Sequence, residues 1–172
     1  VILIAHSMGA PVALATARLI PQRFIGVVAV DSLKNVEWQF DAEQKKEFME
    51  SWERNYGATC ASFVSNMFPR SADPELVKRV HRDMCGAPAA IALTIMRQFL
   101  DYDGAAALAA VDVPVRCINS AASPTSVETN RAYHADFDAV ELEGVGHFLM
   151  MERPDEFNEH LTAIIEELSA GE

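Results

Sequence analysis

Cysteine, basic side chains and long apolar runs are all scarce in this sequence. Its three cysteines are widely spaced and odd in number, so we expect neither a disulfide framework nor a zinc site. No apolar run reaches the length of a membrane span, and there is no signal-peptide pattern. These absences favour a reducing compartment, and we expect a cytoplasmic protein.

Basic side chains are also few compared with acidic ones. Fourteen Lys and Arg stand against 25 Asp and Glu, which gives a formal charge of −11. That charge argues against nucleic acid or an anionic membrane as the main partner. The sequence has no glycine-rich nucleotide motif and no metal-ligand spacing, so we expect no cofactor and no metal. Nothing in the composition indicates an oligomeric state.

What the chain does have is the composition of a globular protein. Half of its 172 residues are hydrophobic and 23% are charged, and this length suits one domain with a small insertion. Apolar runs at 1–5, 24–30, 113–118 and 139–142 predict strands, and helical patterns separate most of them. The alternation predicts an α/β fold with a parallel sheet of about four strands.

The middle of the chain carries only helical signals. Asp41 with Gln44 predicts a capping box, and the Asp73-Pro74 pair and Pro88 predict further helix starts. We therefore divide the chain into an α/β core, at 1–34 and 111–172, and a helical insertion at 35–110.

The strongest chemical signal is a serine between the first strand and the first helix. The segment Ala5-His6-Ser7-Met8-Gly9 places Ser7 in a sharp turn, with small residues two positions before and after it. The alternative interpretation is an ordinary turn in which Ser7 only caps the helix.

A histidine loop near the other end of the chain is the second signal. The segment Gly144-Val145-Gly146-His147-Phe148 follows the last predicted strand and precedes the last helix, which begins at Pro154. A histidine on such a loop can reach a serine hydroxyl and take its proton.

Together these segments resemble the nucleophile elbow and the catalytic-histidine loop of the α/β-hydrolase family. The resemblance implies Ser7 as nucleophile, His147 as general base and the Met8 backbone N–H as an oxyanion donor. It also implies a small acyl substrate, most often a carboxylic ester, with His6 and Phe148 as candidate substrate contacts. Ala5 replaces the first glycine of the family pattern, and the insertion lies where family caps occur.

The acid partner of His147 is the least determined part of the pattern. The family most often carries it in the loop after the penultimate strand, but residues 119–125 contain no carboxylate. We choose Asp31, which ends the second strand, although an aspartate there can simply close the strand and cap a turn. The other candidates are Glu128, Asp136 and Asp138, or no acid at all.

The chain opens with Val1, directly on a strand that is apolar on both faces. We therefore expect a C-terminal portion of a longer protein, with the nucleophile strand at an open sheet edge and the second oxyanion donor lying upstream. Three functions remain open. They are a serine ester hydrolase, a carbon–carbon bond hydrolase or cofactor-free haloperoxidase of the same fold, and a truncated or degenerate non-catalytic relative.

Overall fold

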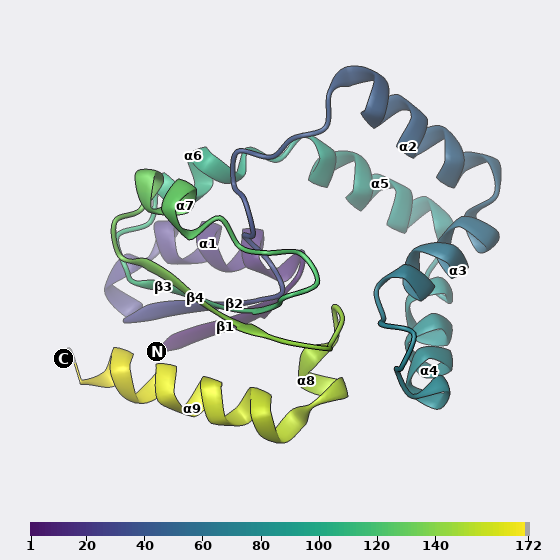
Figure 1. Cartoon of the computed structure of the whole chain (residues 1–172). Helices are drawn as coiled ribbons and strands as arrows, with labels where there is room; N and C mark the ends of the chain where they lie inside the picture. The colour runs from purple at the N-terminus through teal and green to yellow at the C-terminus, as the bar shows by residue number, and fades with distance from the viewer. Residues whose placement is uncertain (171–172) are drawn as a thin grey trace. The chain divides into compact units, whose positions relative to one another are not determined.

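The computed structural model, described here for residues 1–170, divides into two compact units. The first unit comprises residues 1–37 and the chain from 103 onward, and it contains one parallel sheet (Figure 1). Its strands, in spatial order, are β1 (Ile2–His6), β2 (Gly26–Val30), β3 (Val115–Ser120) and β4 (Phe137–Leu142). The predicted α/β class and parallel sheet are confirmed. Because all four strands are parallel, their carboxyl ends lie at one end of the sheet.

Helices cover both faces of this sheet, with α1 on one face and α9 on the other (Figure 1). Strand β2 is buried along its whole length because its side chains alternate between the two faces of the sheet and both faces are covered. Val27 and Ala29 pack with the α1 side, whereas Val28 and Val30 pack with the α9 side. The helices of this unit are α1 (Gly9–Leu19), the short 3-10 helix η1 (Pro21–Arg23), α6 (Gly104–Ala109), α7 (Val127–Tyr133), α8 (Leu149–Glu152) and α9 (Pro154–Ser169).

Strand β1 forms one edge of the sheet in the described part of the chain. It pairs with β2 on one side only, which matches the open edge expected for the strand before Ser7. Its sequence is nevertheless apolar, and Ile4 is half exposed. An apolar edge of this kind is a surface on which further pairing or aggregation can occur.

The second unit, residues 38–102, is helical and is described by itself. Its helices are α2 (Ala42–Arg54), α3 (Tyr56–Asn66), α4 (Pro74–Cys85) and α5 (Ala89–Leu100). The predicted capping box is present: the Gln44 N–H donates to Asp41, and the Asp41 N–H donates to the Gln44 side chain, both at 2.9 Å. Trp52 is buried at the centre of an aromatic cluster with Phe48, Tyr56 and Phe63.

The expectation that the cysteines form no disulfide is wrong for one pair. Cys60 on α3 and Cys85 at the end of α4 are joined by a disulfide across a sequence separation of 25 residues. Helices α3 and α4 pack against each other and bring the two Cα atoms to 5.8 Å. Sequence spacing alone does not reveal that packing. The third cysteine, Cys117, is a free thiol buried in β3, and burial raises its pKa.

The boundary between the units differs from the sequence-based division. Residues 35–37 and 103–110, assigned to the insertion above, lie in the first unit because α6 packs against α1 and α7. The short helix α8 has no counterpart among the predicted elements. Within residues 1–170 no helix is both long and apolar enough to cross a membrane.

Candidate active site

Ser7 lies in a backbone conformation that serine rarely adopts. Its φ is +53°, in the left-handed region, directly after β1 and before α1. Two backbone hydrogen bonds hold the turn: the Ser7 N–H donates to Val30 O at 2.9 Å, and the Ala10 N–H donates to Ser7 O at 3.0 Å. A left-handed backbone conformation costs free energy in a residue other than glycine. It persists where the surrounding structure holds it, commonly at functional sites.

The small residues on either side of Ser7 face each other across the turn. A methyl group placed on Gly9 would lie 3.5 Å from the Ala5 Cβ, which is ordinary van der Waals contact. There is therefore room in the turn for the methyl group of Ala5 beside Gly9. The geometry explains why alanine is accommodated at this position, where the family pattern has glycine.

Asp31 and His147 come together at the carboxyl end of the sheet. Asp31 directly follows β2 with a φ of +44°, and His147 lies on the loop after β4. The distance from Asp31 Oδ2 to His147 Nδ1 is 2.6 Å. The two side chains are mostly buried, with relative exposures of 8% and 17%. This contact joins residues 116 positions apart in the sequence.

The second oxygen of Asp31 is held by two donors. Its Oδ1 accepts from the Ser120 N–H at 2.9 Å and from Lys34 Nζ at 2.9 Å. Burial acts to raise the pKa of Asp31, but the hydrogen bonds from His147, Ser120 and Lys34 outweigh it and bring the pKa below its usual range. Asp31 is therefore an ionised carboxylate at neutral pH.

The charge on Asp31 decides the tautomer of His147. An ionised carboxylate only accepts hydrogen bonds, so the proton between the two groups belongs to His147 Nδ1. A neutral imidazole protonated at Nδ1 has an unprotonated Nε2. That nitrogen is the one that can act as a base.

Side chains from three elements fix the loop that carries His147. Ser120 Oγ donates to Val145 O at 2.6 Å, and the Gly146 N–H donates to both carboxylate oxygens of Glu152 at 3.0 Å. His6 Nε2 donates to the carbonyl oxygen of His147 at 2.8 Å. Burial raises the pKa of Glu152, although the backbone N–H groups that it accepts from act in the other direction.

His6 and Phe148, the candidate substrate contacts, pack on the catalytic histidine candidate. The His6 ring lies 4.5 Å from that of His147, and the Phe148 ring lies 5.3 Å from it, centroid to centroid. Burial lowers the pKa of His6, so it is neutral at neutral pH. Met8 is the N-cap of α1, at the end of the helix where backbone N–H groups lack an intrahelical acceptor.

Two of the other candidate carboxylates form ion pairs with arginines. Asp136 pairs with Arg116 at 2.8 Å, and Asp138 pairs with Arg131 at 3.2 Å. Both precede or begin β4 and so lie at the opposite end of the sheet from the His147 loop. Glu128 lies in the first turn of α7.

Three side chains that contact this cluster were missed by the sequence analysis: Lys34, Ser120 and Glu152. Each bonds to a residue distant in the sequence or to the backbone of a loop, and none belongs to a recognisable motif. The sequence offers one hint of these contacts, at the end of β3. The position where the family most often carries its acid has no carboxylate there. In the structure the Ser120 N–H at this position donates to the Asp31 carboxylate instead.

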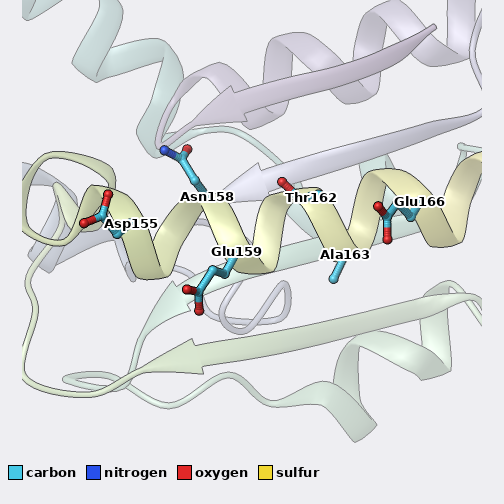
Figure 2. Close-up of a pocket in the computed structure, with 6 residues that line it drawn as sticks. All are labelled: Asp155, Asn158, Glu159, Thr162, Ala163 and Glu166. Atoms are coloured by element: carbon cyan, nitrogen blue, oxygen red, sulfur yellow. The ribbon is translucent and has the colours of Figure 1, made fainter.

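A hollow along α9 shares no lining residue with this cluster. Figure 2 shows the side chains that line it. All its lining residues come from one helix: Asp155, Asn158, Glu159, Thr162, Ala163 and Glu166. A row of polar side chains along one helix face is what a solvated surface requires. Among residues 1–170, no group of three or more His, Cys, Asp or Glu side chains could hold a metal ion.

Solved structures of other proteins share this fold. An esterase from Thermogutta terrifontis is 20% identical with a TM-score of 0.76, over 98% of this chain and 65% of its own. A hydrolase from Oleispira antarctica is 16% identical with a TM-score of 0.81, over 96% and 64%. A bromoperoxidase from Bacillus anthracis is 19% identical with a TM-score of 0.78, over 96% and 67%.

The comparisons also show how much of such a fold this chain contains. It spans about 65% of the length of the esterase and hydrolase structures that it matches. No curated protein matches it significantly in sequence. The family model described as "Alpha/beta hydrolase family" matches residues 1–160, nearly the whole sequence. The chain therefore belongs to the α/β-hydrolase family.

Proposed function

We propose that the protein is a serine hydrolase that cleaves a carboxylic ester or related acyl substrate through Ser7, His147 and Asp31. The observation that carries the proposal is the 2.6 Å contact between Asp31 and His147, made beside the strained turn that presents Ser7. A serine hydroxyl is a weak nucleophile without an adjacent base. An imidazole oriented by a buried carboxylate is the group that supplies this base.

In the proposed reaction, Ser7 Oγ attacks the acyl carbon while His147 Nε2 takes the hydroxyl proton. The imidazolium is stabilised by Asp31, and it returns the proton to the leaving alkoxide oxygen, which departs as the alcohol. The acyl group stays on Ser7. Water, deprotonated by His147, then attacks the acyl carbon. The bond between that carbon and Ser7 Oγ breaks, Oγ takes the proton back from His147, and the acid is released.

We assign Met8 one further role in this reaction. Its backbone N–H would donate to the carbonyl oxygen as negative charge develops in the tetrahedral intermediate. A donor of this kind contributes about 10²–10³ in rate. In the same proposal, His6 and Phe148 border the position of the acyl group.

Covalent labelling tests the assignment of the nucleophile. A fluorophosphonate should modify the natural full-length protein once, at Ser7, as located by peptide mass spectrometry. Ser7→Ala should abolish labelling, and His147→Ala should slow it by about three orders of magnitude or more, because the hydroxyl loses its base.

The matched control is Ser65→Ala, which removes an exposed hydroxyl bonded only to the backbone of its own helix. This variant should be labelled at the rate of the parent protein. Labelling that survives in Ser7→Ala, or that is unchanged in His147→Ala, would refute the proposal.

A second reaction class is favoured by one comparison. The bromoperoxidase from Bacillus anthracis shares the fold at 19% identity, so a cofactor-free haloperoxidase reaction is the alternative, beside carbon–carbon bond hydrolysis. A panel of p-nitrophenyl esters separates the classes. Rapid turnover of short-chain esters would support the ester hydrolase, whereas labelling of Ser7 without ester turnover would support the alternatives. A non-catalytic relative would show neither.

We further propose that the helical unit at residues 38–102 acts as a cap. Its support is its place in the chain: it is inserted between β2 and β3, whose carboxyl ends carry Asp31 and Ser120. The cytoplasmic location stays a prediction. The disulfide between Cys60 and Cys85 counts against it, because disulfides persist mainly in oxidising compartments.

A further inference from the structure

Lys34 bridges two of the strands that build the site. Its ammonium group donates to Asp31 Oδ1 at 2.9 Å and to the carbonyl oxygen of Ser120 at 2.9 Å. Asp31 follows β2, and Ser120 ends β3. The lysine therefore fastens the carboxylate to the neighbouring strand at the place where the loop of that strand has no acid of its own.

The environment of Lys34 separates it from an ordinary surface lysine. Its side chain is 21% exposed and its partner Asp31 only 8% exposed, whereas the pair of Lys78 with Glu75 is 70% and 76% exposed. Exposed pairs contribute little because water screens them. A mostly buried pair interacts more strongly, and removing one partner leaves the other charge without compensation.

The geometry around Asp31 divides its two oxygens between two tasks. Oδ1 accepts from Lys34 and from the Ser120 N–H, and Oδ2 accepts from His147 Nδ1. With Oδ1 fixed by two donors, the carboxylate plane is set and Oδ2 points at the imidazole. The positive charge of Lys34 also offsets part of the negative charge that His147 faces.

We propose that Lys34 is a positioning residue that holds Asp31 toward His147 and offsets part of the carboxylate charge that the imidazole faces. This inference rests on the proposed serine hydrolase mechanism. It adds to that mechanism a cationic side chain that touches neither Ser7 nor the imidazole in the described contacts.

The direction of the effect follows from the charges that surround His147. Besides Asp31, these are His6, which is neutral at neutral pH, and Glu152, whose carboxylate holds the loop of His147. Without Lys34, the imidazole would face an uncompensated carboxylate. The imidazolium would then be favoured, and its proton would be released at a higher pH.

The test is the pH dependence of fluorophosphonate labelling at Ser7 in the natural full-length protein. Lys34→Gln removes the charge but keeps a polar side chain. It should move the acid limb of the labelling rate upward by about one pH unit. The rate on the plateau should fall less than about tenfold, because Asp31, His147 and Ser7 remain. Lys34→Arg keeps the charge and should restore the parent profile.

Arg131→Gln is the matched control. It removes a cation from the ion pair with Asp138, in the same unit but at the other end of the sheet. It should leave the acid limb in place. Thermal melts show whether each variant is folded over the pH range of the assay. They therefore distinguish a shifted acid limb from a labelling rate that is lowered by unfolded protein.

Two outcomes would overturn the inference: an unshifted limb in Lys34→Gln, or the same shift in Lys34→Arg and Lys34→Gln. Failure of the proposed function looks different, because the parent protein itself would then not be labelled at Ser7.

Discussion

Replacing Asp31 by asparagine probes the site most directly, because it changes one atom and removes one charge. In the structure, Oδ1 is held by Lys34 and by the Ser120 N–H, both of which require an acceptor. The amide oxygen of asparagine should take that place, since its NH2 group cannot accept from either donor. The NH2 group would then face His147 Nδ1.

That arrangement reverses the tautomer of the imidazole. Facing a donor, Nδ1 must be the unprotonated nitrogen, so the proton moves to Nε2 and the base that activates Ser7 is lost. The expected loss in kcat/KM for ester hydrolysis at pH 7 is about 10⁴-fold, which corresponds to about 5.5 kcal/mol of transition-state stabilisation. The labelling rate of Ser7 should fall in parallel.

Asp31→Asn should also change how the stability of the protein depends on pH. The pKa of Asp31 is lower in the folded than in the unfolded protein, so the unfolded chain binds a proton first as the pH falls. Asp31 therefore contributes stability above its unfolded pKa, near 4, and that contribution is lost as the pH falls through the folded value. In Asp31→Asn the decline of the melting temperature on the acid side should be shallower.

The control for Asp31→Asn is Asp138→Asn, which removes a carboxylate from an exposed pair with Arg131. It should keep full activity. A loss of less than about tenfold in Asp31→Asn, in a protein where His147→Ala is inactive, would show that Asp31 does not orient the imidazole.

Two further substitutions test the supports of the site and of the helical unit. Glu152→Ala leaves the Gly146 N–H without its acceptor and should lower the free energy of unfolding by about 1–3 kcal/mol. Activity should also fall, because the His147 loop loosens. The control Glu159→Ala, on the outer face of α9, should change neither the stability nor the activity. Equal effects of Glu152→Ala and Glu159→Ala would contradict a supporting role for Glu152. Opening the disulfide with Cys60→Ser should destabilise the helical unit by about 3 kcal/mol, given the separation of 25 residues. Circular dichroism melts of Cys60→Ser measure this loss, and those of Cys117→Ala, which removes a free thiol, are the comparison. A much smaller loss in Cys60→Ser would show that the bond does not form.

The sequence by itself determined the four strands, most of the helices and the order in which the candidate site residues appear along the chain. Apolar runs flanked by polar turns predicted the strands, and capping residues predicted the starts of α2, α4 and α5, because these signals are local. Ser7 and His147 could be singled out for the same reason. Each is surrounded by a short motif that fixes its own backbone.

Only the tertiary structure decided which partners those residues have. Asp31 meets His147 across 116 positions, and Lys34 and Ser120 then hold the carboxylate in place. Cys60 reaches Cys85 because α3 packs on α4. These contacts arise from the packing of parallel strands and helices, so no local pattern in the sequence records them. The orientation of a charged pair and the pairing of two thiols are properties of the folded chain alone.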